Sequence, residues 1–96
     1  MYATVRRYEG VTDAAEAGRL VREGFVPLIS EMEGFIDYYW VDAGNGVMVS
    51  TSVFETRAEE EASTERAASF VHEHMTELLP NPPQVTAGEV VATKSA

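Results

Sequence analysis

Residues 35–55, FIDYYWVDAGNGVMVSTSVFE, hold five of the nine aromatic side chains of this 96-residue chain around a central Gly-Asn-Gly. Two β-favouring segments joined by a short glycine-rich connection are typical of a β-hairpin. We expect the loop to cover residues 43–46, which places Trp40 opposite Val49 and Tyr38 opposite Thr51. An isolated hairpin is only marginally stable in water, so other elements must pack against it.

Both faces of this predicted hairpin carry many apolar side chains. A two-residue loop keeps the same grouping, whereas a loop of three or five residues reverses the relation between the strands. The first predicted face consists of Ile36, Tyr38, Trp40, Val47, Val49, Thr51 and Val53. The second consists of Phe35, Tyr39, Val41, Met48, Ser50, Ser52 and Phe54.

A strand and a helix are predicted before the hairpin. Residues 2–10, YATVRRYEG, alternate in the manner of a strand. Asp13 is a candidate N-cap, with Glu16 three residues later completing a capping box. Apolar residues then recur at spacings of three and four up to Gly34, and Pro27 inside this pattern is expected to bend the helix.

A second helix and a last strand are predicted after the hairpin. Thr56 and Glu59 form a capping box at the start of the helix, which ends before the prolines of residues 80–83. The acidic run ETRAEEEASTE, residues 55–65, is interpreted as a solvated first turn. Residues 85–93, VTAGEVVAT, alternate as a strand.

This order predicts an α+β protein with the ferredoxin-like βαββαβ arrangement, in one domain spanning residues 1–96. Two helices lie on one face of a four-stranded antiparallel sheet. The other face is also apolar, and a second copy of the chain is the simplest cover for it. We therefore expect a homodimer formed through the open sheet face, as a dimeric α/β barrel.

Composition restricts the possible partners. The formal net charge of −9 argues against nucleic acid and anionic membranes, which bind basic surfaces. There is no cysteine, so disulfides and thiolate metal sites are excluded. No apolar run approaches the roughly 18 residues of a membrane span. The first ten residues lack the apolar region of a secretory signal, so a cytoplasmic location is expected.

Residues 25–56, FVPLISEMEGFIDYYWVDAGNGVMVSTSVFET, resemble the antibiotic biosynthesis monooxygenase-like family. The resemblance implies a dimeric α/β barrel that oxidises a small aromatic, polyketide-like substrate without a cofactor. It also implies an asparagine near the end of the first strand, a tryptophan closing the third and a histidine early in the second helix. This chain has Arg6 and Arg7, Phe54 and Ser63 at those places. Phe54 is therefore a candidate substrate-binding residue.

The candidate site residues have structural alternatives. His74, predicted on the apolar side of the second helix, is the candidate base, or else a packed histidine near a helix end. Tyr38 and Trp40 are expected to stack on a flat aromatic ligand while Arg6 holds its oxygen, or else to pack in a subunit interface. Ser50 and Ser52 belong to a rival pocket wall between sheet and helices.

No metal site is predicted. His72 and His74 point in directions about 200° apart on a helix and cannot hold one ion, and His72 is expected in solvent. The functional hypotheses are thus a cofactor-independent monooxygenase and a non-catalytic homodimer that binds a small molecule or acts as an interaction domain.

Overall fold

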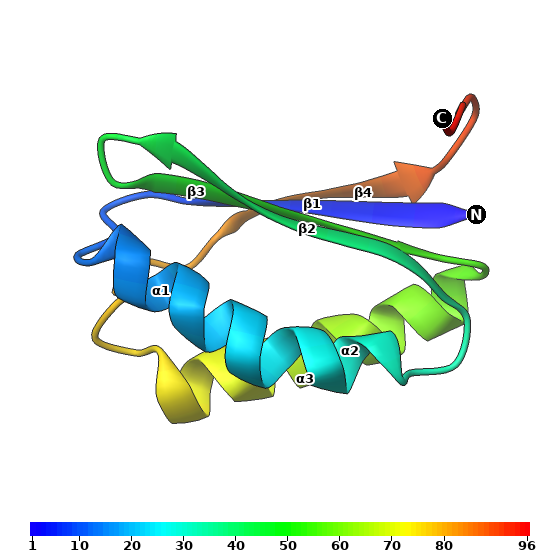
Figure 1. Cartoon of the computed structure of the whole chain (residues 1–96). Coiled ribbons are helices and arrows are strands. Elements are labelled where there is room, and N and C mark those ends of the chain that lie inside the picture. The colour runs from blue at the N-terminus through cyan, green and yellow to red at the C-terminus, as the bar shows by residue number, and fades with distance from the viewer.

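The structure, a computed structural model describing residues 1–96, is a twisted sheet with its helices on one side (Figure 1). In chain order the elements are β1 (Tyr2–Tyr8), α1 (Ala14–Leu20), the π-helical stretch η1 (Val21–Phe25), α2 (Val26–Ser30), β2 (Phe35–Gly44), β3 (Val47–Phe54), α3 (Arg57–His74) and β4 (Gln84–Glu89). The antiparallel strands lie in the order β2-β3-β1-β4, so the predicted ferredoxin-like fold is confirmed. None of the helices combines the length and apolar character needed to cross a bilayer.

The two helical segments begin where the sequence indicates. The Asp13 side chain accepts a hydrogen bond from the Glu16 backbone N–H, but the Glu16 carboxylate pairs with Arg19 and does not complete the predicted capping box. Thr56 and Glu59 form a complete capping box. The helix with the predicted bend at Pro27 has a π-helical stretch just before that proline. A proline crowds the carbonyl four residues earlier, which here belongs to Glu23 inside η1.

The hairpin corrects the predicted register. Trp40 lies opposite Ser50 and Tyr38 opposite Ser52, instead of Val49 and Thr51. The predicted four-residue loop is a tighter turn, in which Gly44, Asn45 and Gly46 all have positive φ, with a β-bulge between Asp42 and Gly44. A bulge adds one residue to one strand, and a shift of one residue exchanges the two faces.

The register decides which side chains meet the helices. Tyr38 and Trp40 share the helix-facing side of the sheet with Ser50, Ser52 and the first strand's Arg6 and Tyr8. Tyr39 and Val41, by contrast, lie on the open face and are 59% and 49% exposed. The core lies between sheet and helices, and its buried apolar residues are Tyr8, Val11, Ala17, Val21, Phe25, Ile29, Met48, Phe54, Met75 and Leu79.

Candidate functional site

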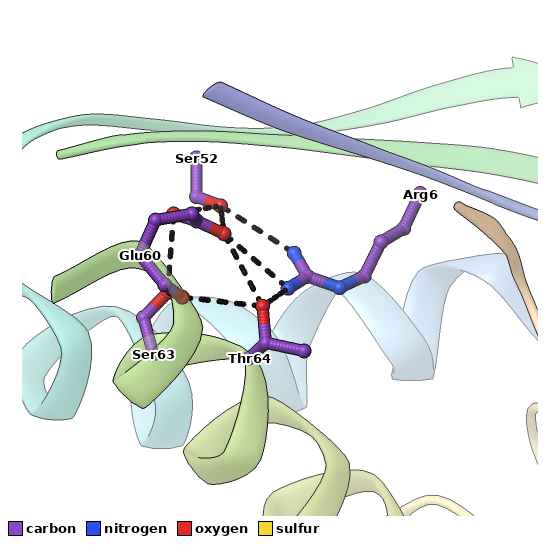
Figure 2. A network of polar contacts seen from close by, with 5 residues as sticks. All are labelled: Arg6, Ser52, Glu60, Ser63 and Thr64. Atoms are coloured by element: carbon purple, nitrogen blue, oxygen red, sulfur yellow. Dashed lines mark hydrogen bonds and ion pairs between the residues drawn. The ribbon is translucent and has the colours of Figure 1, made fainter. Parts of the chain in front are cut away.

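A buried network of charged and hydroxyl side chains joins β1, β3 and α3 (Figure 2). Arg6 Nη2 lies 3.5 Å from Glu60 Oε1 and donates a 2.6 Å hydrogen bond to Thr64 Oγ1. Ser52 Oγ donates to the Glu60 carboxylate at 3.1 Å, and Ser63 Oγ reaches Glu60 Oε2 at 3.2 Å. The Glu60 carboxylate therefore has partners on both of its oxygens.

The local structure explains how these residues meet. Arg6 faces the helices from the middle of β1, directly opposite Ser50 of β3. Glu60, Ser63 and Thr64 have the spacing i, i+3, i+4, which places them on one side of α3. Arg6 and Glu60 are only 5% and 1% exposed. A buried ion pair of this kind needs hydrogen bonds to its polar atoms, and the three hydroxyls provide them for the Glu60 carboxylate and for Nη1 and Nη2 of Arg6.

The buried position of Glu60 corrects the interpretation of residues 55–65 as a solvated turn. Most acids of the run are exposed, but Glu60 is buried against the sheet. In the sequence, the burial of Glu60 is indicated only by its spacing from Ser63, Thr64 and Ala67 along one side of the helix. This spacing identifies Glu60 as buried only when Arg6 is known to lie opposite.

An aromatic cavity of about 20 Å³ adjoins this network, between the sheet, η1 and α3. The rings of Tyr8 and Trp40 have centroids 5.5 Å apart, and the Phe25 ring lies 5.4 Å from that of Tyr38 and 5.4 Å from that of Phe70. The cavity is lined by Arg6, Tyr8, Val21, Phe25, Tyr38, Trp40, Ser50, Ala67, Phe70, Val71 and Met75. Three predicted ligand residues, Arg6, Tyr38 and Trp40, therefore come together.

Trp40 Nε1 is buried and has no hydrogen-bond partner in the chain. An unpaired buried donor costs about 1–3 kcal/mol, so such groups are uncommon in folded proteins. The cavity has room for one water molecule or for one oxygen atom of a ligand. Either could accept the hydrogen bond that the indole N–H lacks.

The two phenols of the cavity are hydrogen-bond donors at neutral pH. Burial raises the pKa of Tyr38 well above its usual value of 10.0, and the nearby Tyr8 adds to this effect while the charge of Arg6 opposes it. Burial also raises the pKa of Tyr8, again with Arg6 in opposition. Both phenols keep their protons, and indole, phenol and guanidinium side chains line the cavity.

A larger pocket of about 380 Å³, the proline pocket, shares Arg6 and Tyr8 with the aromatic cavity. Its volume falls in the range of small-molecule sites. Its lining residues are Arg6, Tyr8, Thr64, Ala67, Ala68, Val71, His72, Thr76, Leu79, Pro80, Asn81, Pro82, Pro83 and Val85. Ala67 and Val71 also line both spaces, so the two adjoin along the same side of α3.

His74 and Phe54 lie away from these two spaces. The His74 side chain is 53% exposed, and it lines an outer groove of about 610 Å³ between α3 and the first helical segment. Its ring packs on Phe70, with centroids 4.8 Å apart. Phe54 is fully buried against Phe35 and does not line the aromatic cavity. The roles predicted for His74 and Phe54 stay predictions.

The histidine that lines the proline pocket is His72, which is exposed, as the helix pattern predicted. No group of three or more His, Asp or Glu side chains is placed to hold a metal ion.

These features define a ferredoxin-like α+β protein with a polar and aromatic site between its sheet and its helices. No protein-family model and no curated protein matches the sequence. Solved structures do match, and they show that the chain has the fold of antibiotic biosynthesis monooxygenase-like proteins.

Three of these structures cover nearly the whole chain. A protein of unknown function from Nitrosomonas europaea has a TM-score of 0.81 and 20% identity over 99% of this chain and 93% of its own. The ActVA-Orf6 monooxygenase of Streptomyces coelicolor, in complex with nanaomycin D, has a TM-score of 0.76 and 16% identity over 99% and 91%. A candidate antibiotic biosynthesis monooxygenase from Nitrosomonas europaea has a TM-score of 0.78 and 13% identity over 98% and 93%.

Proposed function

We propose that this protein binds a small, oxygen-reactive aromatic compound between its sheet and α3 and oxidises it without a cofactor. The observation that carries the proposal is the buried Trp40 N–H, which has no partner in a cavity that also contains Tyr8, Tyr38 and Arg6. All of these groups donate hydrogen bonds, so they fit a carbonyl or phenol oxygen on a flat ring. The fold shared with a monooxygenase that binds nanaomycin D supports the same class of ligand.

The donors suit a reaction in which negative charge develops on a substrate oxygen. An anthrone-type substrate loses a proton from its CH₂ carbon, and the charge moves to its carbonyl oxygen. Fixed donors in a water-poor site stabilise that charge. The carbanion then gives its electrons to dioxygen and forms a hydroperoxide, and loss of water leaves a second carbonyl. One dioxygen is consumed and one water is released for each CH₂ converted to C=O.

The proton requires a base, and we place it at His72 instead of the predicted His74. His72 lines the proline pocket with Arg6 and Tyr8, whereas His74 lines the outer groove behind the Phe70 ring. An imidazole changes its charge near neutral pH, as a general base requires. Tyr8 and Tyr38 cannot serve, because burial raises the pKa of both phenols.

Oxygen uptake with 1,8-dihydroxyanthrone tests this function. We expect uptake above the protein-free rate, a loss of about 10²-fold or more in His72→Gln, as for removal of a general base, and a clear loss in Trp40→Phe. A loss of oxygen uptake in His74→Gln but not in His72→Gln would identify His74 as the base, as the sequence predicted. Uptake at the protein-free rate by the wild-type protein would overturn the proposed oxidation.

A non-catalytic, ligand-binding role is the second candidate. The absence of the asparagine, tryptophan and histidine that the family resemblance implies favours it, because Arg6, Phe54 and Ser63 stand at those places. Saturable binding of the anthrone, seen as a change in the fluorescence of the single tryptophan, without oxygen uptake would support this role over the first.

We also propose that the protein is a homodimer formed through the open face of its sheet. The helices cover one face only, as Figure 1 shows. Across the middle of the other face, Tyr39, Thr51 and Val5 lie in register on neighbouring strands. Tyr39 is 59% exposed and Val5 38%. Burial of this face against a second copy would remove its apolar surface from water.

A further inference from the structure

The charge of Arg6, the cation of the site, is already balanced inside the protein. Its guanidinium lies 3.5 Å from the Glu60 carboxylate, and both side chains are at least nine-tenths buried. Glu60 is itself fixed by Ser52, Ser63 and Thr64, as Figure 2 shows. Arg6 and Glu60 together therefore bring no net charge to the pocket.

Arg6 still has hydrogen-bonding capacity. Its bonds to Ser52 and Thr64 run through Nη1 and Nη2, so its Nε–H has no acceptor in the chain. Arg6 lines both the aromatic cavity and the proline pocket. It can donate to a ligand oxygen there without a free positive charge to attract an anion.

We propose that Glu60 sets the charge selectivity of this site, so that it accepts neutral aromatic carbonyl compounds and rejects aromatic carboxylates of the same shape. A second carboxylate near Arg6 would be repelled by Glu60 and would lose its hydration in a buried site. A neutral carbonyl accepts the same hydrogen bonds from Arg6 and Trp40 without that cost. This inference rests on the binding site of the proposed function, but not on its oxidation chemistry.

Acetophenone and benzoate form a suitable pair of test compounds, because they differ little in shape and one is an anion at pH 7. Their dissociation constants are measured from the ¹H–¹⁵N indole signal of Trp40, the single tryptophan of the chain. We expect the wild-type protein to bind acetophenone about tenfold or more tightly than benzoate. In Glu60→Gln, whose Arg6 is no longer paired, we expect the ratio to fall by about tenfold or more.

The neighbouring Glu61 offers a matched control. Glu61→Gln makes the same change in net charge, but Glu61 is 63% exposed and pairs with Arg57 on the outer side of α3. In Glu61→Gln, the ratio of the dissociation constants of benzoate and acetophenone should stay within about twofold of the wild-type value, since screening weakens the effect of an exposed charge.

The outcomes separate the two proposals. Equal or tighter binding of benzoate by the wild-type protein would overturn the selectivity, and this measurement needs no variant to fold. Equal ratios in Glu60→Gln and wild type, with both proteins folded, would overturn the role of Glu60. If neither compound moves the Trp40 signal, the proposed binding site fails, and the selectivity fails with it.

Discussion

Arg6 and Glu60 face each other across the interior at 3.5 Å, although they lie 54 positions apart in the sequence and neither belongs to a recognisable motif. One comes from the middle of β1 and the other from the first turn of α3. Their contact determines the electrostatics of the candidate site, and it also makes the fold sensitive to substitution at either position.

Removal of one partner of this pair should destabilise the protein strongly. Glu60→Ala leaves a buried, unpaired guanidinium, and we expect the free energy of unfolding to fall by about 3–5 kcal/mol. The double variant Arg6→Met/Glu60→Leu should recover most of this loss, because apolar side chains can replace a buried pair. Urea denaturation gives both values. A loss below about 1 kcal/mol in Glu60→Ala would contradict the burial of the pair.

The buried phenols predict a loss of stability in alkali. Burial raises the pKa of Tyr38 and Tyr8 above their usual value of 10.0, so the unfolded chain releases these protons at a lower pH than the folded chain. The stabilisation that the buried, protonated phenols give the folded state is complete below pH 10 and is lost as the pH rises above 10. Each tyrosine can lower the free energy of unfolding by about 1.4 kcal/mol per pH unit in that window.

Denaturation measured from pH 8 to pH 11 checks this slope. Tyr38→Phe cannot ionise at that position, so it should show a shallower decline above pH 10 than the wild-type protein. A wild-type stability that is flat across pH 10 would mean that the two phenols are not shielded from solvent.

Gly24 and Gly18 provide a matched pair of substitutions in the first helical segment. A Cβ atom at Gly24 would lie 2.9 Å from Phe70 Cζ, whereas one at Gly18 would have no neighbour within 4 Å. Gly18→Ala should stabilise the helix by about 0.5–1 kcal/mol. Gly24→Ala should instead destabilise the protein by about 1–3 kcal/mol, because the Phe70 ring must move.

Thermal denaturation of both variants gives the comparison. In a Phe70→Leu background the obstructing ring is absent, so Gly24→Ala should then behave more like Gly18→Ala. Equal stabilisation by the two alanines in the wild-type background would contradict the close approach of Phe70 to η1.

The proposed dimer can be tested at Tyr39. Sedimentation equilibrium at micromolar concentration should give twice the chain mass of 10.5 kDa for the wild-type protein. Tyr39→Glu places a charge in the middle of the open sheet face and should shift the protein towards the single chain. Ala62→Glu adds the same charge to the exposed side of α3 and should leave the mass unchanged. A folded wild-type monomer would rule out the dimer.

The element order and the helix starts could be predicted because they depend on local patterns. The capping box at Thr56 and the cap at Asp13 lie where the sequence indicates, and the four strands occur in the predicted order, although β4 ends at Glu89 and not at residue 93. The register of the hairpin could not be predicted, because the bulge before Gly44 accompanies three consecutive residues with positive φ. One extra residue moved Tyr38 and Trp40 to the helix-facing side.

The site was predictable only in part, for a related reason. Arg6, Tyr38 and Trp40 could be predicted as ligand residues from their side-chain chemistry, and the observed register brings them together. Glu60 resembles its exposed acidic neighbours until a buried arginine is placed opposite it. His74 follows the apolar spacing of α3, but Ala67, Val71 and Met75 of that series line the aromatic cavity, whereas His74 lines the outer groove.

The proposed binding site depends most on the unpaired N–H of Trp40, and a crystal soaked with 1,4-naphthoquinone tests it directly. We predict the ring between the sheet and α3, with one quinone oxygen about 3 Å from Trp40 Nε1. A quinone bound only in the outer groove beside His74, with the space around Trp40 unchanged, would contradict the proposed site.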